Sequence, residues 1–375
     1  MMGTQQPYRY RHRVGIILSV GRLFRLTWSL GMLTSELIEH ILNTLPQRTI
    51  GVLGDLFLDR YLDIDPALNE PSIETGLTAY QVTQVRNYPG AAGTVINNLA
   101  ALGVGRIATI SLIGDDGEGY ELRRALAQLA AVELRGIVTT PHRRTPTYTK
   151  PMLGREELNR LDIKNRTPTP GAIEDAIIDH LIGVWPQLDA LLVVDQVRED
   201  DSGVVTQRVR ERLTTFAKQD PDKFVLADSR QRIALFQNMC IKPNQAEAEQ
   251  LRESSPTAAF PAALIDATRH YRAIFATAGA TGIHLFYPGM TPPAPRRIPA
   301  YSVPGPVDIC GAGDSCAAGI ACAIVSGASY EQAAAFGNLI ASITIQQIGI
   351  TGTATPEQVR KRWQEVVTHG EATQG

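Results

Sequence analysis

The sequence has no excess of positive charge and little cysteine. Lys and Arg total 36 against 38 Asp and Glu, a formal net charge of −2, so no polycationic surface is available to neutralise a nucleic-acid backbone. The four cysteines are too few for a disulfide framework and form no C-x-x-C pair, which favours a reducing, cytoplasmic compartment. These two shortages argue against nucleic-acid-binding proteins and against disulfide-rich secreted domains.

Several catalytic motifs are also missing. The chain has no G-x(4)-G-K-[ST] phosphate loop, no H-E-x-x-H and no cluster of Cys and His that would bind zinc. Residues 103–108 fit G-x-G-x-x-A, but they follow a predicted helix and precede a predicted strand, the reverse of a dinucleotide-binding fingerprint. The sequence therefore argues against P-loop, zinc-dependent and NAD-dependent enzymes.

The first 35 residues differ from the rest, because they hold five arginines and no acidic residue before Glu36. No uncharged run there approaches the roughly 20 residues of a membrane span, so we expect no membrane partner. We expect residues 1–34 to be a disordered extension, or Met32 to be the true start, with a targeting segment as the alternative. The remaining composition, 44% hydrophobic and 20% charged, predicts one globular domain over residues 35–365 and a tail over 366–375.

Strand-like and helix-like segments alternate along that domain. Ser35 is the predicted cap of a first helix, Glu36–Leu45. The apolar runs that predict strands are Thr49–Leu53, Ile107–Ile113, Ala190–Val194, Phe224–Ala227, Cys240–Ile241 and Ala273–Thr277. Strands buried on both faces read as continuous apolar runs, as Leu191-Leu192-Val193-Val194 does. We therefore predict an α/β fold, a doubly wound and mostly parallel sheet with helices on both faces.

Two stretches break this alternation. Residues 72–87 and 145–163 both contain strand-like segments with no helix between them. We place them in a small, separate β-sheet that covers the ligand as a lid.

Acidic and amide side chains recur directly after the predicted strands. Asp55 and Asp59 follow the first strand, and Asp195, Asp228 and the pair Asn244 and Glu247 follow later ones. A single such residue is most often a helix cap or a turn former. Because ligands of doubly wound sheets bind beyond the carboxyl ends of the strands, their recurrence at one sheet edge predicts a binding site there.

The most specific motif is D-x-x-G-A-G-D over residues 308–314, which leads into the small-residue run Ser315–Val325. Glycines allow the backbone amides to approach an anion, and the N-terminus of the following helix attracts negative charge. A carboxylate in that first turn could accept a proton from a hydroxyl while the same amides stabilise a transferring phosphoryl group. Thr277–Gly282 is a second glycine loop after a strand, and residues 90–93 (G-A-A-G) form a third before a helix.

Together these motifs resemble those of the PfkB, or ribokinase-like, family of carbohydrate kinases, in the expected order from about Ile50 to Thr355. The segment Gly54–Tyr61 (G-D-L-F-L-D-R-Y) is most similar to the kinase domain of heptose-phosphate kinases. The resemblance implies an ATP- and Mg²⁺-dependent transfer of phosphate to a hydroxyl of a sugar or sugar phosphate, with a monovalent cation as a further candidate cofactor. It also implies a small-molecule substrate and a homodimer formed through the lid.

The resemblance implies roles for individual residues. Asp314 would be the general base, the amides of Ala312 and Gly313 would form the anion hole, and Gly311 would belong to the same catalytic motif. The substrate-binding residues would be Asp55, Asp59, Gly90, Gly93 and Thr94. The nucleotide-binding residues would be Asn244, Glu247, Thr277, Gly279, Gly282 and Asn338, with Glu247 also serving the metal. Arg230 would contact a phosphate or be an ordinary surface arginine.

Two departures from the family pattern concern the substrate and the signature motif. The heptose kinases carry G-G-A-A-N where this chain has G-A-A-G-T over residues 90–94, so a substrate-contacting asparagine is replaced by Thr94. Cys310 replaces a threonine or similar small residue, and we expect it to be a buried small hydrophobe rather than a nucleophile. The alternatives are a kinase of nucleosides or other small molecules with the same fold, and a non-catalytic sugar- or nucleotide-binding module.

Overall fold

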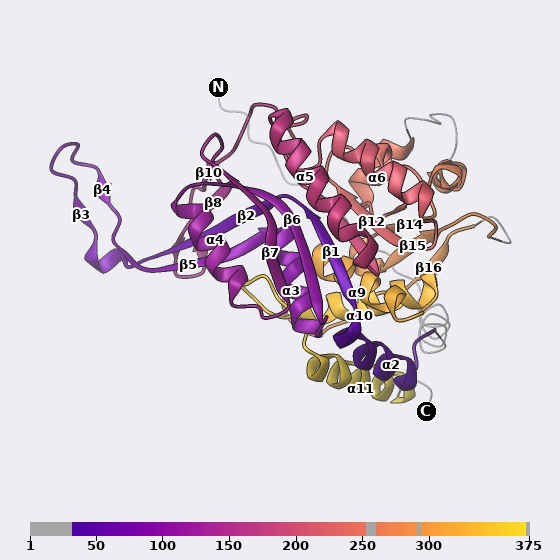
Figure 1. The fold of residues 1–375 in the computed structure, drawn as a ribbon. Coiled ribbons are helices and arrows are strands. Elements are labelled where there is room, and N and C mark those ends of the chain that lie inside the picture. The colour runs from indigo at the N-terminus through magenta and orange to yellow at the C-terminus, as the bar shows by residue number, and fades with distance from the viewer. Residues whose placement is uncertain (1–31, 253–259, 291–293, 373–375) are drawn as a thin grey trace, which may run out of the picture.

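The computed structural model describes residues 32–252, 260–290 and 294–372, and a nine-stranded sheet forms its centre (Figure 1). In spatial order the strands are β16 (Arg296–Ile298), β15 (Ile283–Phe286), β14 (Ala273–Thr277), β13 (Cys240–Ile241), β12 (Phe224–Ser229), β11 (Ala190–Asp195), β1 (Thr49–Gly54), β6 (Arg106–Gly114) and β7 (Val132–Thr140). The strands from β7 to β14 are parallel, and β15 and β16 are antiparallel additions at one edge.

Helices cover both faces of this sheet. One face carries α2 (Ser35–Thr44), α3 (Ala92–Leu102), α4 (Gly117–Ala127), α9 (Ala312–Val325), α10 (Tyr330–Thr344) and α11 (Pro356–Ala372). The other carries α5 (Gly171–Val184), α6 (Gln207–Gln219) and α8 (Phe260–Ala267), and the short α7 (Gln245–Ala248) follows β13. Leu192 and Val194 pack into the first core, while Leu191 and Val193 pack into the second. The predicted doubly wound α/β fold is confirmed, because its central strands are buried on both faces.

A second, smaller sheet forms the lid. Its order is β10 (Leu161–Ile163), β8 (Thr147–Leu153), β2 (Leu56–Ile64) and β5 (Val82–Ala91), with β9 (Glu156–Glu157) paired to β8. The predicted lid segments therefore contribute β5, β8, β9 and β10, and β2 joins them directly after β1. Residues 70–79 form a two-stranded hairpin instead, β3 (Glu70–Pro71) with β4 (Thr78–Ala79), which projects away from the molecule in Figure 1.

The fold extends beyond the predicted domain at both ends. Leu33 is fully buried, and Thr34 rather than Ser35 caps α2 by accepting a hydrogen bond from the amide of Leu37 (3.2 Å). At the other end α11 continues to Ala372, and Val366 is buried. The remainder of the predicted N-terminal extension, residues 1–31, lies outside the described residues. Within the described part of the chain, no helix combines the length and apolarity needed to span a bilayer.

Ala91 has a backbone conformation that glycine normally adopts. It joins β5 to α3 with φ 53° and ψ −116°, a region in which the Cβ atom of an L-residue is crowded. The amide that follows, that of Ala92, donates to the carbonyl of Asp55 (3.0 Å) and so holds the start of α3 against the junction of β1 and β2. Strain at this position is therefore maintained by the structure around it.

Ala91→Gly is expected to raise the free energy of unfolding by about 1 kcal/mol, because relief of the strain exceeds the conformational entropy that glycine adds to the unfolded chain. Urea denaturation of the two proteins measures the change. Ala92→Gly, one residue further along and inside α3, is the control and is expected to lower the free energy by about 1 kcal/mol. Equal destabilisation by both variants would show that Ala91 is not strained.

Candidate active site

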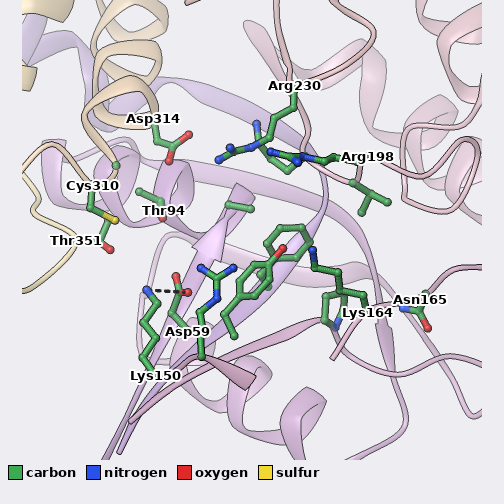
Figure 2. Close-up of a pocket in the computed structure, with 18 of the residues that line it drawn as sticks. Asp59, Thr94, Lys150, Lys164, Asn165, Arg198, Arg230, Cys310, Asp314 and Thr351 are labelled. Atoms are coloured by element: carbon green, nitrogen blue, oxygen red, sulfur yellow. Dashed lines mark hydrogen bonds and ion pairs between the residues drawn. The ribbon is translucent and has the colours of Figure 1, made fainter. Parts of the chain in front are cut away.

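A cavity of about 360 Å³ lies between the lid sheet and the carboxyl ends of the central strands (Figure 2). Side chains of β2 and β8 form its lid side, the loops after β11 and β12 face them, and the N-terminus of α9 closes one end. Its lining residues are Phe57, Asp59, Ala91, Thr94, Pro146, Tyr148, Lys150, Arg160, Lys164, Asn165, Gln196, Val197, Arg198, Glu199, Ser202, Arg230, Cys310, Gly311, Asp314 and Thr351. The cavity lies beyond the strand ends, where the sequence predicts a binding site.

Asp314 lies in the first turn of α9 and faces the cavity, with protein around the rest of its carboxyl group. Burial raises the pKa of Asp314 to about 7, and the nearby Asp228 adds to this, while Lys242 and Arg230 oppose it. A carboxyl group with such a pKa exchanges its proton near neutral pH. It therefore has the properties of a general base or acid.

The turn before α9 positions backbone amides beside this carboxylate. Gly311 has φ 75°, and a Cβ atom there would lie 2.6 Å from the Cγ2 atom of Thr351. In the described residues the amide of Ala312 donates to the carbonyl of Ile309 (3.1 Å), whereas the amides of Gly313 and Asp314 have no carbonyl partner. Gly313 and Asp314 therefore supply the amides that could bind an anion at this helix N-terminus.

Asp59 and Lys150 lie across the cavity from Asp314 (Figure 2). The Nζ atom of Lys150 is 3.3 Å from Oδ1 of Asp59 and 3.0 Å from the hydroxyl of Tyr61. A Cβ atom on Gly90 would lie 2.4 Å from Oδ2 of Asp59, so only glycine leaves room for this carboxylate. The alternation of β2 and β8 points Asp59 and Lys150 to the same face of the lid sheet.

Four basic side chains, Arg160, Lys164, Arg198 and Arg230, line the cavity; we call them the basic wall. Arg160 and Lys164 lie over the ring of Tyr148, at 4.6 and 5.6 Å from its centroid. Arg198 is exposed, and its guanidinium has no hydrogen-bond or ion-pair partner in the described part of the chain. Asp162 pairs with Arg160 (2.7 Å) and with Lys164 (3.9 Å). With Lys150 the lining holds five basic side chains against three acidic ones, and positive charge stays in excess when Asp162 is added, so the cavity attracts anions.

Thr94 and Cys310 complete the wall nearest α9. Thr94 is buried at the start of α3, and it lines the cavity. Cys310 is exposed to the cavity, so the expectation that it is buried is wrong: the turn that precedes α9 turns its side chain toward the lid. Burial by surrounding groups nevertheless raises the pKa of the Cys310 thiol, which disfavours the thiolate.

Lys242 was not singled out by the sequence, although it directly precedes the P-N dipeptide that leads into α7. It is 3% exposed, and its Nζ atom lies 2.8 Å from Oδ2 of Asp228. A Cβ atom on Gly313 would lie 3.4 Å from that Nζ atom, so the ammonium group sits beneath the first turn of α9. Burial alone would lower the pKa of Lys242, but Asp228 and Asp314 outweigh it and keep the side chain charged.

Asn244, Glu247 and Thr277 lie together at the ends of β13 and β14. The side chain of Asn244 accepts a hydrogen bond from the amide of Glu247 (2.9 Å), and Glu247 accepts one from the amide of Asn244 (2.8 Å). Asn244 also forms a parallel bridge with Thr277. Asn244 and Glu247 thus form a capping box at the start of α7, and these hydrogen bonds fix the direction of the Glu247 carboxyl group.

A magnesium ion is compatible with this arrangement. Burial raises the pKa of Glu247, and the nearby Asp228 adds to this, while Lys242 and Arg230 oppose it; a cation beside Glu247 would favour its ionised form. The oxygen donors are of the kind that Mg²⁺ prefers. In the part of the chain that the structure describes, no group of three or more His, Cys, Asp or Glu side chains could hold a metal ion by itself. Water and phosphate oxygens would therefore complete the coordination.

The remaining predicted nucleotide-binding residues lie next to one another outside the cavity. Gly279 and Gly282 flank a short turn with φ 54° and 95°, and a Cβ atom on Gly282 would collide with the carbonyl of Ile298 at 2.0 Å. Asn338 donates from its side chain to the carbonyls of Ile298 (3.2 Å) and Pro299 (3.0 Å). Asn338 thus holds the segment that packs against the second glycine loop.

Three predicted substrate-binding residues, Asp55, Gly90 and Gly93, do not line the cavity. Asp55 is 3% exposed, and both of its carboxylate oxygens accept hydrogen bonds from backbone amides. A Cβ atom on Gly93 would lie 2.4 Å from the Cβ atom of Pro89, so this glycine allows α3 to pack against β5. Four basic side chains line the cavity although no sequence motif marks them: Lys150, Arg160, Lys164 and Arg198. The only sequence signal for them is their position in or beside a predicted lid strand, or after a central strand.

Comparison with known proteins agrees with this geometry. The family model described as pfkB family carbohydrate kinase matches residues 56–358. Bifunctional protein HldE of Bradyrhizobium diazoefficiens is 29% identical over 340 residues, and that of Caulobacter vibrioides is 30% identical over 321 residues. The matches cover 86% and 84% of this chain but only 64% and 63% of those relatives, so the chain spans slightly less than two thirds of their length.

Solved structures share the fold. Ribokinase of Arabidopsis thaliana complexed with ribose and ATP has a TM-score of 0.61 and 17% identity, covering 84% of this chain and 98% of that one. Ribokinase of Thermotoga maritima has a TM-score of 0.63 and 18% identity, covering 84% and 99%. Because the family model spans the lid, the central strands and α9, the chain belongs to the pfkB family of carbohydrate kinases, which are phosphotransferases.

Proposed function

We propose that the protein transfers the γ-phosphoryl group of ATP to a hydroxyl group of a sugar that already carries a phosphate, as a heptose phosphate does. The observation that carries this proposal is the cavity itself, which brings Asp314, Asp59 and the basic wall together. An uncharged sugar needs hydroxyl-binding groups but no cluster of four arginine and lysine side chains. A phosphorylated sugar uses both.

In this proposal Asp314 accepts the proton of the attacking hydroxyl. A base with a pKa of about 7 is well matched to that transfer near neutral pH. The amides of Gly313 and Asp314, with the α9 dipole, stabilise the negative charge on the transferring phosphoryl group. Lys242 adds positive charge beneath the same turn. Asp59 holds sugar hydroxyls on the opposite side, and closure of the lid sheet excludes water.

The nucleotide would bind beside the cavity. Thr277, Gly279 and Gly282 would contact the ATP phosphates, Asn338 would support the wall of the nucleotide site, and Glu247 would supply an oxygen ligand to Mg²⁺. The ion would neutralise part of the charge on those phosphates.

A monovalent cation belongs to the same proposal. Phosphofructokinase-2 of Escherichia coli, which has a similar fold, was solved in complex with potassium. We also propose a cytoplasmic location, since ATP is available there and all four cysteines are free.

An acceptor panel tests the proposal, with each sugar supplied in parallel with its phosphate, and with nucleosides included. We expect ATP consumption to be stimulated most by a phosphorylated sugar. Asp314→Asn is expected to lower kcat at least about 100-fold, because the amide cannot accept the proton, while ATP still raises the melting temperature. Asp175→Asn, an exposed change on α5, is the matched control and is expected to remain active.

Three results would contradict parts of this assignment. Full activity of Asp314→Asn would remove the base. Preference for unphosphorylated sugars or nucleosides would remove the role of the basic wall and favour the alternative kinases. Binding of ATP and sugar without any turnover would favour a non-catalytic binding module.

We further propose that the chain forms a homodimer through the lid. Among the described strands β5 is an edge strand, and Val85 on it is 54% exposed. Ile73 and Leu77 in the projecting hairpin are 98% and 71% exposed. An exposed strand edge with apolar side chains is a surface for pairing with another strand.

Sedimentation velocity is expected to give a dimer for the natural chain and a monomer for the double variant Ile73→Lys/Val85→Lys. Ile182→Lys on α5 is the control; a monomeric natural chain would contradict the proposal.

A further inference from the structure

The loop that joins β11 to α6 supplies a quarter of the cavity lining. Residues 196–204, which we call the 196–204 loop, place Gln196, Val197, Arg198, Glu199 and Ser202 against the cavity. Most of this loop has no helix or strand to satisfy its backbone, and buried peptide groups need hydrogen-bond partners. Thr169 donates to the carbonyls of Asp201 and Gly203 (both 2.7 Å), and three buried charged side chains from other parts of the fold bind the rest of the loop.

Asp55, at the junction of β1 and β2, binds the amide side of the loop. Its Oδ2 atom accepts from the amides of Gln196 (2.8 Å) and Val197 (3.0 Å), and its Oδ1 atom accepts from the amide of Val204 (2.8 Å). A Cβ atom on Gly203 would lie 2.6 Å from Oδ1, so glycine permits this approach. One carboxylate thus joins the two ends of the loop with charge-assisted hydrogen bonds.

Arg232, which follows β12, binds the carbonyl side. Its guanidinium donates to the carbonyls of Val197 (2.5 Å) and Arg198 (3.2 Å) and to both carboxylate oxygens of Asp195 (2.6 and 3.2 Å). The side chains of Arg232 and Asp195 are 8% and 1% exposed. The planar guanidinium is the only side-chain group with enough fixed donors to serve all these acceptors at once.

Arg143, between β7 and β8, is the third partner. It is 6% exposed and donates to the carbonyl of Ser202 in the loop and to the carbonyls of Thr167 (3.0 Å) and Pro168 (3.3 Å) outside it. The three side chains together hold the loop at both ends and in the middle. Arg198 therefore projects from a fixed backbone although its own guanidinium is unpaired in the described residues.

We propose that Asp55, Arg143 and Arg232 are positioning residues that fix the 196–204 loop so that Arg198 is oriented to bind the anionic group of the acceptor. This rests on the proposed phosphorylated acceptor only for the identity of the anion. None of the three touches the cavity as a binding group except through the loop. Their effect is to make the anion site rigid before the acceptor binds, which lowers the entropy lost on binding.

Arg232→Lys tests the role of the guanidinium. Lysine keeps the positive charge next to Asp195, but one ammonium group cannot also reach both loop carbonyls. Asp55→Asn keeps the shape and removes the acceptor for three amides. Arg208→Lys, the same substitution on the exposed surface of α6, is the matched control. Should Asp55→Asn fail to fold, Arg232→Lys alone decides the question.

Two measurements are made on each variant. Amide hydrogen exchange of the peptide containing residues 196–204, in the protein without substrate, is expected to be at least about tenfold faster than in the natural protein and in Arg208→Lys. The KM for the phosphorylated acceptor is expected to rise about tenfold or more, while the KM for ATP stays within about twofold of that of the natural protein. The ratio of kcat/KM for the phosphorylated sugar to kcat/KM for the unphosphorylated sugar is expected to fall.

The outcomes separate this inference from the proposed function. Unchanged exchange in the loop would overturn the anchoring. Faster exchange with an unchanged acceptor KM and unchanged preference would overturn the positioning role. If the natural protein phosphorylates no acceptor, the proposed function fails, and the exchange measurement still decides whether the three residues hold the loop. Calorimetry with inorganic pyrophosphate then tests the anion site. We expect pyrophosphate to bind more weakly to Arg232→Lys than to the natural protein and equally well to Arg208→Lys; equal binding to Arg232→Lys would overturn the positioning role.

Discussion

Close packing of α9 against α10 determines where the charges of the site meet. Residues 315–323 of α9 are all buried, and most of them are small. A Cβ atom on Gly319 would lie 3.0 Å from the Cα atom of Gly337 on α10, so the two helices approach closely only because both positions are glycine. A larger side chain would displace α9. The N-terminus of α9, and with it Asp314, would then leave the ends of β11 and β12.

The charges around that helix end are arranged in layers. Lys242 and Asp228 form an ion pair beneath the first turn, Asp314 lies above them, and the basic wall faces the cavity. A charged side chain buried away from water and without a partner would cost free energy. Here Lys242 has Asp228 and Asp314 as neighbours of opposite charge. The same principle holds one strand away, where Arg232 pairs with Asp195 and also binds the loop. The site thus combines enclosed ion pairs with a few side chains left to face a ligand.

Much of this could be read from the sequence, and the reasons are physical. Strands buried on both faces leave long apolar runs, so Ala190–Asp195 and its neighbours were found within one or two residues. The glycine motif before a small-residue helix singles out Asp314 in the sequence, and Asp314 lines the cavity. The sequence suggests Asp55 as a substrate-binding residue, whereas in the structure its carboxylate binds backbone amides of the 196–204 loop. Those amides lie about 140 residues away in the chain, so the sequence gives no sign of this contact. Of the basic wall, only Arg230 is singled out by its place after a strand. Lone arginines and lysines in loops, such as Arg160, Lys164 and Arg198, look like ordinary surface residues in a sequence.

In the proposed function Asp314 acts as a base whose pKa is set by its enclosure, and the pH dependence of kcat/KM for the acceptor at saturating ATP isolates this role. We expect kcat/KM to fall about tenfold per pH unit below an apparent pKa near 7, since only the ionised carboxylate accepts the hydroxyl proton. A kcat/KM that stays constant between about pH 5 and pH 9 would contradict it.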